Sequence, residues 1–174
     1  MASPHPLAAR PWDKLYFYFF IHMVPIMLFV DSAAYIPSHL LPRPMAHIKS
    51  FYDANFSDPL QLTQPTWFYL FAMTEFFLQL PLGIWALFAL PRDDPLVPLG
   101  LGSYAALAAF TTWISIGELL MWDESPFAWE KKVKLGALYA VYGVMFTGMA
   151  IHMGCRIKRA LLATAEMEGR KKCK

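Results

Sequence analysis

The chain contains four apolar runs, each long enough to cross a lipid bilayer as a helix. They cover residues 15–36, 66–90, 95–121 and 133–155, and about 20 apolar residues are enough to span the hydrocarbon core. Hydrophobic residues make up 57% of the 174 residues and charged residues only 16%, which is too little polar surface for a soluble domain. The sequence therefore predicts an all-α polytopic membrane protein, a bundle of four transmembrane helices.

The first run also has features of a cleavable signal peptide, because basic residues precede it and a Ser-Ala-Ala sequence follows it. The run is long, however, and Pro25 interrupts it. We therefore expect it to remain as the first transmembrane helix. A proline inside a helix removes one backbone hydrogen bond, so kinks are expected at Pro25 and, in the second run, at Pro81.

The distribution of basic residues predicts the orientation. With both termini in the cytosol, ten Lys and Arg residues lie on the cytosolic side and five on the other. The connector of residues 37–65 is then a long lumenal loop between the first two helices, and its length favours a cap folded over the bundle. We expect a transmembrane domain over residues 1–160 and a basic cytosolic tail over 161–174.

The tail ends in Arg170-Lys171-Lys172-Cys173-Lys174. Lysines three and four positions from the carboxyl end form a dilysine signal, which coat proteins read in order to return membrane proteins to the endoplasmic reticulum. The alternative is a basic patch that holds the tail against anionic headgroups. We interpret Lys171 and Lys172 as the retrieval signal, so coat proteins are expected partners and the endoplasmic reticulum membrane is the expected location.

A carboxylate lies in the middle of the second apolar run. Glu75 is followed one helical turn later by Gln79, so both side chains project from one face. A carboxylate in hydrocarbon costs about 2.5–3.5 kcal/mol on insertion scales and needs a partner, a cavity or a ligand. A structural hydrogen bond between helices is the alternative. A polar pocket is favoured because a carboxyl group costs more than such a tie requires.

Other polar residues in or near the runs have two interpretations each. Asp31 is either a counter-ion for a cationic ligand or an interfacial residue that reaches the headgroups. Asp58 precedes a proline and is typical of a turn or a helix start. The hydroxyl of Thr112 most commonly bonds within its own helix. Tyr139 and Tyr142 share a helix face, and their hydroxyls need partners inside a membrane.

No sequence motif indicates a metal, a cofactor or a nucleic acid. The five histidines are too scattered for metal-ligand spacing, and there is no nucleotide loop or nucleophile elbow. Membrane lipid and a ligand within the bundle are therefore the expected small-molecule partners.

Four motifs follow one another in a recognisable order. They are Pro-Ile-x-x-x-x-Asp at 25–31, Phe-Ser-Asp-Pro-Leu at 56–60, Pro-Thr-Trp-Phe at 65–68 and Glu-x-x-x-Gln-Leu-Pro at 75–81. With these motifs, the chain resembles the EXPERA-domain superfamily and, within it, the sigma-2 receptor (transmembrane protein 97) family in a fungal-type form. The resemblance covers all four predicted spans, including Thr111-Thr112 and the Tyr139-x-x-Tyr142 pair.

This resemblance implies an occluded pocket in the endoplasmic reticulum membrane that opens sideways to the bilayer and binds sterols or lipophilic amines. It makes Asp31 the anion that pairs with a ligand amine, supported by Asp58. The remaining pocket residues that it implies are Glu75, Gln79, Thr112, Tyr139 and Tyr142. Sterol or lipid handling, or quality control of mitochondrial precursors at the reticulum, is the implied role, and a homodimer is compatible with it.

The same superfamily includes a sterol double-bond isomerase, the emopamil-binding protein. Isomerisation needs a proton donor and a proton acceptor, and the second helix of that enzyme is expected to read His-x-x-x-Glu. This chain has Glu75-x-x-x-Gln79, and Gln does not transfer protons. We therefore expect a binding protein without catalytic residues, with the isomerase as the alternative. A protein that acts only through partners of its tail is a third class. His22 stands three residues before Pro25 instead of two, so the resemblance assigns it no role.

Overall fold

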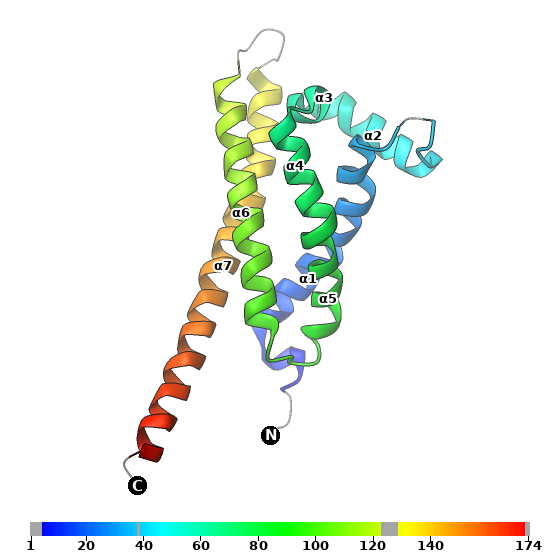
Figure 1. Cartoon of the computed structure of the whole chain (residues 1–174). Coiled ribbons are helices and arrows are strands. Elements are labelled where there is room, and N and C mark those ends of the chain that lie inside the picture. Colours follow the sequence, from blue (N-terminus) through cyan, green and yellow to red (C-terminus); the bar gives the residue numbers. More distant parts are fainter. Residues whose placement is uncertain (1–4, 38, 123–128, 173–174) are drawn as a thin grey trace.

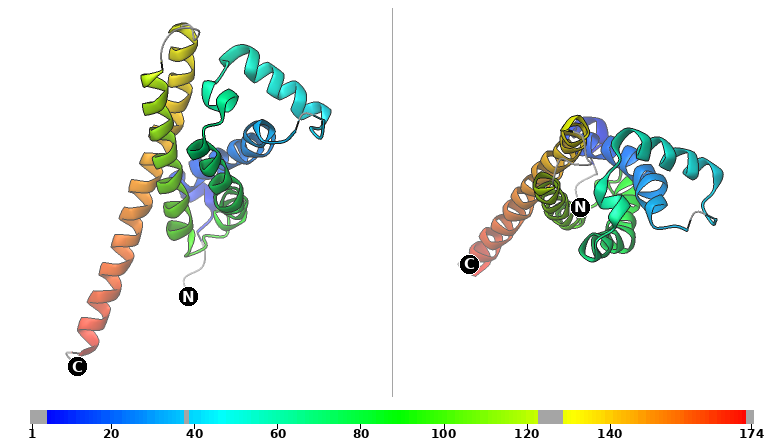
Figure 2. Two further views of the ribbon diagram at one scale, coloured as in Figure 1. Left: turned by 45° about the horizontal axis from the view of Figure 1, so that its top comes forward. Right: turned by 90° about the horizontal axis from the view of Figure 1, so that it is seen from above.

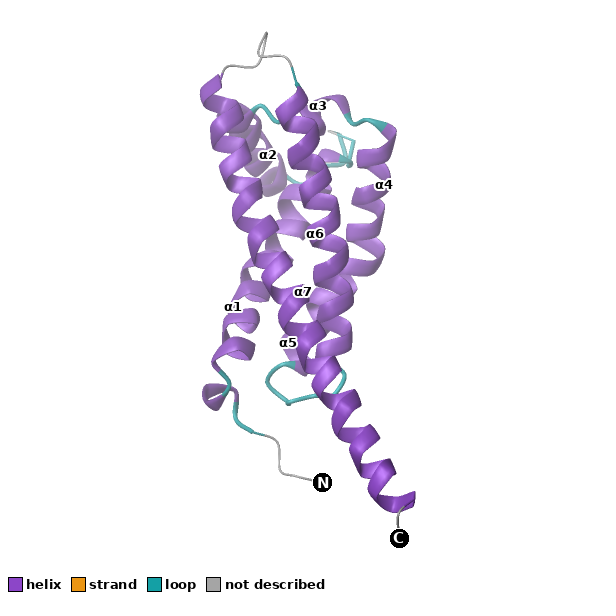
Figure 3. Cartoon of the chain, turned by 90° about the vertical axis from the view of Figure 1, so that its left-hand side faces the viewer, coloured by secondary structure: helices purple, strands orange, loops and turns teal. Residues whose placement is uncertain are grey.

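A computed structural model describes residues 5–37, 39–122 and, without the side chains of the last two, 129–172. This described part contains helices and no strand (Figure 3). Four helical segments within it are long and apolar enough to span a membrane: Pro11–Ala34, Thr66–Ala89, Val97–Met121 and Trp129–Arg170. They confirm the predicted four-span all-α architecture. Figure 1 shows that the first span begins and the last helix ends at the same end of the bundle.

The first two spans each contain a π-helical turn. After a short 3-10 turn, η1 (Leu7–Ala9), the first span consists of α1 (Pro11–Ile26), the π turn η2 (Met27–Asp31) and the 3-10 turn η3 (Ser32–Ala34). The second consists of α4 (Thr66–Thr74), the π turn η4 (Glu75–Gln79) and α5 (Leu80–Ala89). The π turns lie within two residues of Pro25 and Pro81, where kinks were expected. A wider turn redirects hydrogen bonds in a stretch that proline deprives of a donor.

The third and fourth spans, α6 (Val97–Met121) and α7 (Trp129–Lys172), pack along one another. Gly143 permits part of this approach, since an added Cβ would come within 3.3 Å of the Trp113 indole. Beyond the bundle, α7 continues as a single helix past residue 160, the predicted start of the tail (Figure 2). The described side chains from Lys158 onward are exposed there.

The connector between the first two spans forms a cap of two helices, α2 (Arg43–Phe56) and α3 (Pro59–Thr63). Figure 2 shows the cap at the end of the bundle opposite the termini. Ser57 and Gln64 adopt left-handed backbone angles, with φ of 46° and 44°, and end the two helices. The Gln64 amide donates to the Ala34 carbonyl at 2.6 Å, which attaches the cap to the end of the first span.

At the other end of the bundle, a buried aspartate connects three segments. Asp13 on α1 is only 3% exposed and lies 2.5 Å from Arg10 and 2.6 Å from Arg156 of α7. Arg10 also pairs with Asp93 at 3.1 Å, in the connection between α5 and α6. The first span, this connection and the last span are thereby held together by charge-assisted hydrogen bonds.

Candidate functional site

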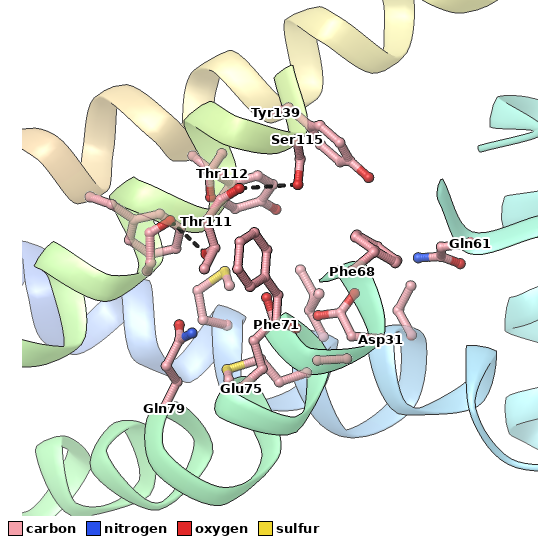
Figure 4. Close-up of a pocket in the computed structure, with 18 of the residues that line it drawn as sticks. Asp31, Gln61, Phe68, Phe71, Glu75, Gln79, Thr111, Thr112, Ser115 and Tyr139 are labelled. Carbon is pink, nitrogen blue, oxygen red and sulfur yellow. Dashed lines mark hydrogen bonds between the residues drawn. The ribbon is translucent and has the colours of Figure 1, made fainter. Parts of the chain in front are cut away.

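A cavity of about 310 Å³ lies within the bundle, lined by all four spans and by the cap (Figure 4). Its polar groups come from the two π turns, from Tyr35 at the end of the first span, from both helices of the cap and from α6 and α7, and aromatic rings make up much of the wall. Six of the seven ligand-binding residues predicted from the sequence line it: Asp31, Glu75, Gln79, Thr112, Tyr139 and Tyr142.

The π turns carry the polar side chains that the first two spans contribute to the cavity. Asp31 is the last residue of η2, whereas Glu75 and Gln79 are the first and last residues of η4. Single π turns inside α-helices occur often at functional sites. In the view of Figure 4, Gln79 lies at one end of the labelled side chains and Gln61 at the other, with Asp31 and Glu75 between them.

The two carboxyl groups of the cavity have no cationic partner among the described residues. The ion pairs found there join Arg10 or Arg156 to aspartates at one end of the bundle and Lys49 to Asp53 on α2. Isolated charge in a low-dielectric site is costly and is met by a proton or by a counter-ion. Asp31 and Glu75 are therefore the groups of this cavity that need a proton or a cation from outside the described residues.

Gln79 supplies an unused hydrogen-bond donor. Its side chain is 2% exposed, and its Nε2 has no hydrogen-bond partner within the described residues. A buried donor left without an acceptor costs about 1–3 kcal/mol. A ligand hydroxyl or carbonyl oxygen in the cavity would recover that free energy.

Asp58, the seventh predicted residue, lies behind the cavity wall. It is fully buried, and its Oδ2 accepts hydrogen bonds from the hydroxyls of Tyr139 at 2.5 Å and Tyr52 at 3.0 Å, both of which line the cavity. Its Oδ1 caps α3 by accepting from the Leu60 amide at 2.9 Å. Asp58 thus acts on the cavity by orienting two tyrosines. Burial, together with the charge of Asp58, raises the pKa of Tyr52 and keeps its hydroxyl protonated as a donor.

Sequence reasoning missed most of the aromatic wall. Tyr35 and Tyr52 come from the end of the first span and from the cap, where no periodic pattern marks a buried face. Burial, followed by the nearby Glu75, raises the pKa of Tyr35. Tyr104 was the detectable member, because a tyrosine in the middle of an apolar run needs a partner for its hydroxyl. That hydroxyl meets Met27 Sδ at 3.7 Å.

Three further polar residues of the spans are placed by their contacts. His22, to which the sequence assigned no role, lies with its Nε2 3.1 Å from the Tyr142 hydroxyl, directly behind a cavity residue. The Thr111 hydroxyl donates to the Ala108 carbonyl of its own helix at 3.1 Å. Glu118 accepts from the Trp122 indole at 3.1 Å and does not line the cavity. The dilysine side chains of Lys171 and Lys172 lie outside the described residues.

The chain matches known proteins along most of its length. The model of the EXPERA (EXPanded EBP superfamily) family matches residues 44–153. The chain is 30% identical to the efficient mitochondria targeting-associated protein 19 of Schizosaccharomyces pombe over 159 residues, which covers 89% of this chain and 81% of that protein. It is 28% identical to the sigma intracellular receptor 2 of Xenopus tropicalis over 143 residues, 78% and 84% of the two chains.

The human sigma intracellular receptor 2 is 34% identical over a shorter stretch of 76 residues, 44% of this chain and 43% of that protein. Family motifs, four spans and these similarities agree. The chain therefore belongs to the EXPERA superfamily, as the motifs in its sequence predicted.

Proposed function

We propose that this protein is a membrane receptor of the endoplasmic reticulum that holds a sterol or a lipophilic amine in the 310 Å³ cavity. The observation that carries the proposal is the pair of carboxyl groups, Asp31 and Glu75, in a largely aromatic cavity with no cation beside them in the described part of the chain. A protonated amine entering this site would form charge-assisted hydrogen bonds in a low dielectric, where such bonds are strong.

A sterol would use the same cavity through different contacts. Its single hydroxyl offers an acceptor to the unpaired Gln79 amide, and its ring system would pack against Phe68, Phe71 and Tyr104. Both ligand classes combine one polar group with a large apolar body, which is the combination that the lining favours.

The cellular role is proposed from the relatives. One is named a sigma intracellular receptor and another an efficient mitochondria targeting-associated protein. We infer a role in sterol or lipid handling, or in quality control of mitochondrial precursors at the reticulum. Cytosolic termini and the Lys171-Lys172 signal, read by coat proteins, would keep the protein there. Replacing both lysines by serine in the tagged full-length protein should release it to later compartments, and retention of this variant would contradict the signal.

Equilibrium binding of a radiolabelled lipophilic amine to the purified protein, with a sterol as competitor, tests the site. We expect saturable binding that the sterol displaces and that Asp31→Asn weakens by at least about 30-fold, since truncating a buried charge pair costs 2 kcal/mol or more. Glu118→Gln is the matched control, because Glu118 lies on the third span away from the cavity.

Unchanged affinity in Asp31→Asn would exclude Asp31 as the counter-ion. If the wild-type protein bound neither ligand, the receptor proposal would fail, and the partners of the tail would become the leading explanation.

A further inference from the structure

A second cavity, of about 170 Å³, lies between the first and second spans. It shares five lining residues with the central cavity, and both carboxyl groups, Asp31 and Glu75, are among them. The acids therefore form part of a wall between two cavities, and each cavity has access to the same anionic groups.

The rest of the second cavity is apolar and reaches the lipid-facing surface. Met73, Phe76 and Phe77 line this cavity and not the central one. Phe77 is 71% exposed and Phe76 is 43% exposed, on a helix that spans the membrane. The hydroxyl of Ser32, also in the lining, donates to the Leu28 carbonyl of its own span and is satisfied. Apart from the shared wall, this cavity has nothing to offer a polar ligand.

We propose that the second cavity binds the unbranched alkyl chain of a membrane amphiphile whose amine or hydroxyl group meets Asp31 and Glu75. This inference rests on the proposed function, because it takes the two acids as the site for the polar group of the ligand. The central cavity is the larger and has aromatic walls suited to a ring system. The second cavity is smaller and is lined by residues on the lipid-facing surface of the bundle. A chain can enter it directly from the acyl layer with little loss of apolar contact.

The two cavities would thus sort ligands by shape. Rigid polycyclic bodies occupy the centre of the bundle, and flexible chains lie between the first two spans. One pair of acids serves both, so ligands of the two shapes compete although their apolar parts lie in different places.

A series of primary alkylamines, from hexylamine to hexadecylamine, tests this assignment. Their affinities would be measured by displacement of a radiolabelled lipophilic amine from the protein in nanodiscs of fixed lipid composition. Referred to the free aqueous concentration of each amine, the affinity should rise about fourfold with each added methylene until the chain fills the cavity. Met73→Trp narrows the second cavity, so the affinity should stop rising at a shorter chain length than in the wild type. The affinity for dodecylamine should fall at least tenfold. Met73→Ala enlarges the cavity, so the affinity should continue to rise to longer chains than in the wild type.

Leu78→Trp is the matched control. Leu78 is on the same span, 54% exposed, and lines neither cavity, so its replacement should leave the whole series unchanged. Comparison with this variant in the same lipid also cancels the partitioning of long amines into the bilayer. Hexylamine has the shortest chain of the series, so its affinity should change least among the variants. If Met73→Trp also loses hexylamine, Phe76→Trp supplies the same comparison from a more exposed position.

The outcomes separate the two proposals. Hexylamine binding with a chain-length dependence that Met73→Trp and Phe76→Trp leave unchanged would overturn the second cavity as the chain site, while the receptor proposal stands. Absence of binding by any amine to the wild-type protein would overturn the proposed function, and the present inference with it.

Discussion

The Tyr139 hydroxyl on α7 donates to Asp58 Oδ2 at 2.5 Å, although 81 positions separate the two residues. The same oxygen accepts from Tyr52 on α2, and the other carboxylate oxygen caps α3. One carboxylate thereby connects both helices of the cap to the last span, and it does so from behind the wall of the ligand cavity. A ligand that displaced either tyrosine would therefore disturb the hydrogen bonds that hold the cap to the last span.

Replacing Asp58 should destabilise the protein more than replacing either tyrosine. Asp58→Ala removes a helix cap worth about 1 kcal/mol and leaves two hydroxyls without an acceptor, each at about 1–3 kcal/mol, so a total loss of about 3 kcal/mol or more is expected. Tyr139→Phe should cost about 1 kcal/mol, because Asp58 keeps its other two donors. Unfolding in detergent measures both, and equal losses would contradict the shared role of Asp58.

Gln79→Leu should separate stability from ligand binding. It removes a buried donor that lacks a partner within the described residues, so the ligand-free protein should gain about 1 kcal/mol of unfolding free energy. Affinity for a sterol should fall about tenfold, whereas affinity for the same sterol skeleton without its hydroxyl should not change. Thermal unfolding and competition binding provide the two measurements. An equal loss for both sterols would mean that Gln79 only shapes the cavity.

Asp13→Ala should be among the most destabilising substitutions at its end of the bundle. It leaves Arg10 and Arg156 without the buried carboxylate that both contact, and breaking a buried pair costs about 3–5 kcal/mol. The arginines retain some contact with solvent, so the lower end of that range is expected. Lys49→Ala is the control, since the Lys49–Asp53 pair has side chains 30% and 32% exposed and should contribute less than about 1 kcal/mol. Similar effects of the two substitutions would argue against the buried pair as a structural centre.

The chain should not restore sterol isomerisation in cells that lack their own sterol double-bond isomerase. Glu75 can exchange a proton, but the residue one turn later is Gln79, which cannot serve as its counterpart. The sterol profile of complemented cells is the measurement, with emopamil-binding protein as the positive control at a matched expression level. Restored isomerisation would contradict the receptor proposal and identify the protein as an isomerase.

The sequence predicts the spans well because a helix that crosses the bilayer needs a long run of apolar residues, and such a run can be read directly from the sequence. The exception is the last helix, predicted over residues 133–155 and found over Trp129–Lys172. Its charged end has left the apolar run but still consists mainly of good helix formers, among them Ala, Leu, Glu, Lys and Arg. The apolar run therefore ends before the helix does.

The candidate site divides in a similar way. Asp31, Glu75 and Gln79 could be identified because each is a polar group inside an apolar run, where the free-energy cost alone singles it out. Tyr35 and Tyr52 come from segments without a regular pattern, and only tertiary packing brings them to the cavity. Asp58 was expected to support the ligand site, but its position behind two tyrosines depends on how the cap folds, which no local pattern encodes.

The π turns at Met27–Asp31 and Glu75–Gln79 also constrain how the gene can change length. A π turn contains one residue more than the α-helical turn it replaces. Losing a single codon there would restore regular α-helical winding and leave the segments on either side in the same rotational phase. For the second span, the face of α5 that packs on α1 would keep its neighbour, whereas Glu75 or Gln79 within the turn would change direction. A single-codon deletion in the regular helix on either side would instead rotate everything beyond it by about 100° about the helix axis. Packing should therefore tolerate a one-codon deletion in an acid-bearing turn better than in the helix around it, so that the extra residue serves the direction of the acid and not the packing of the span.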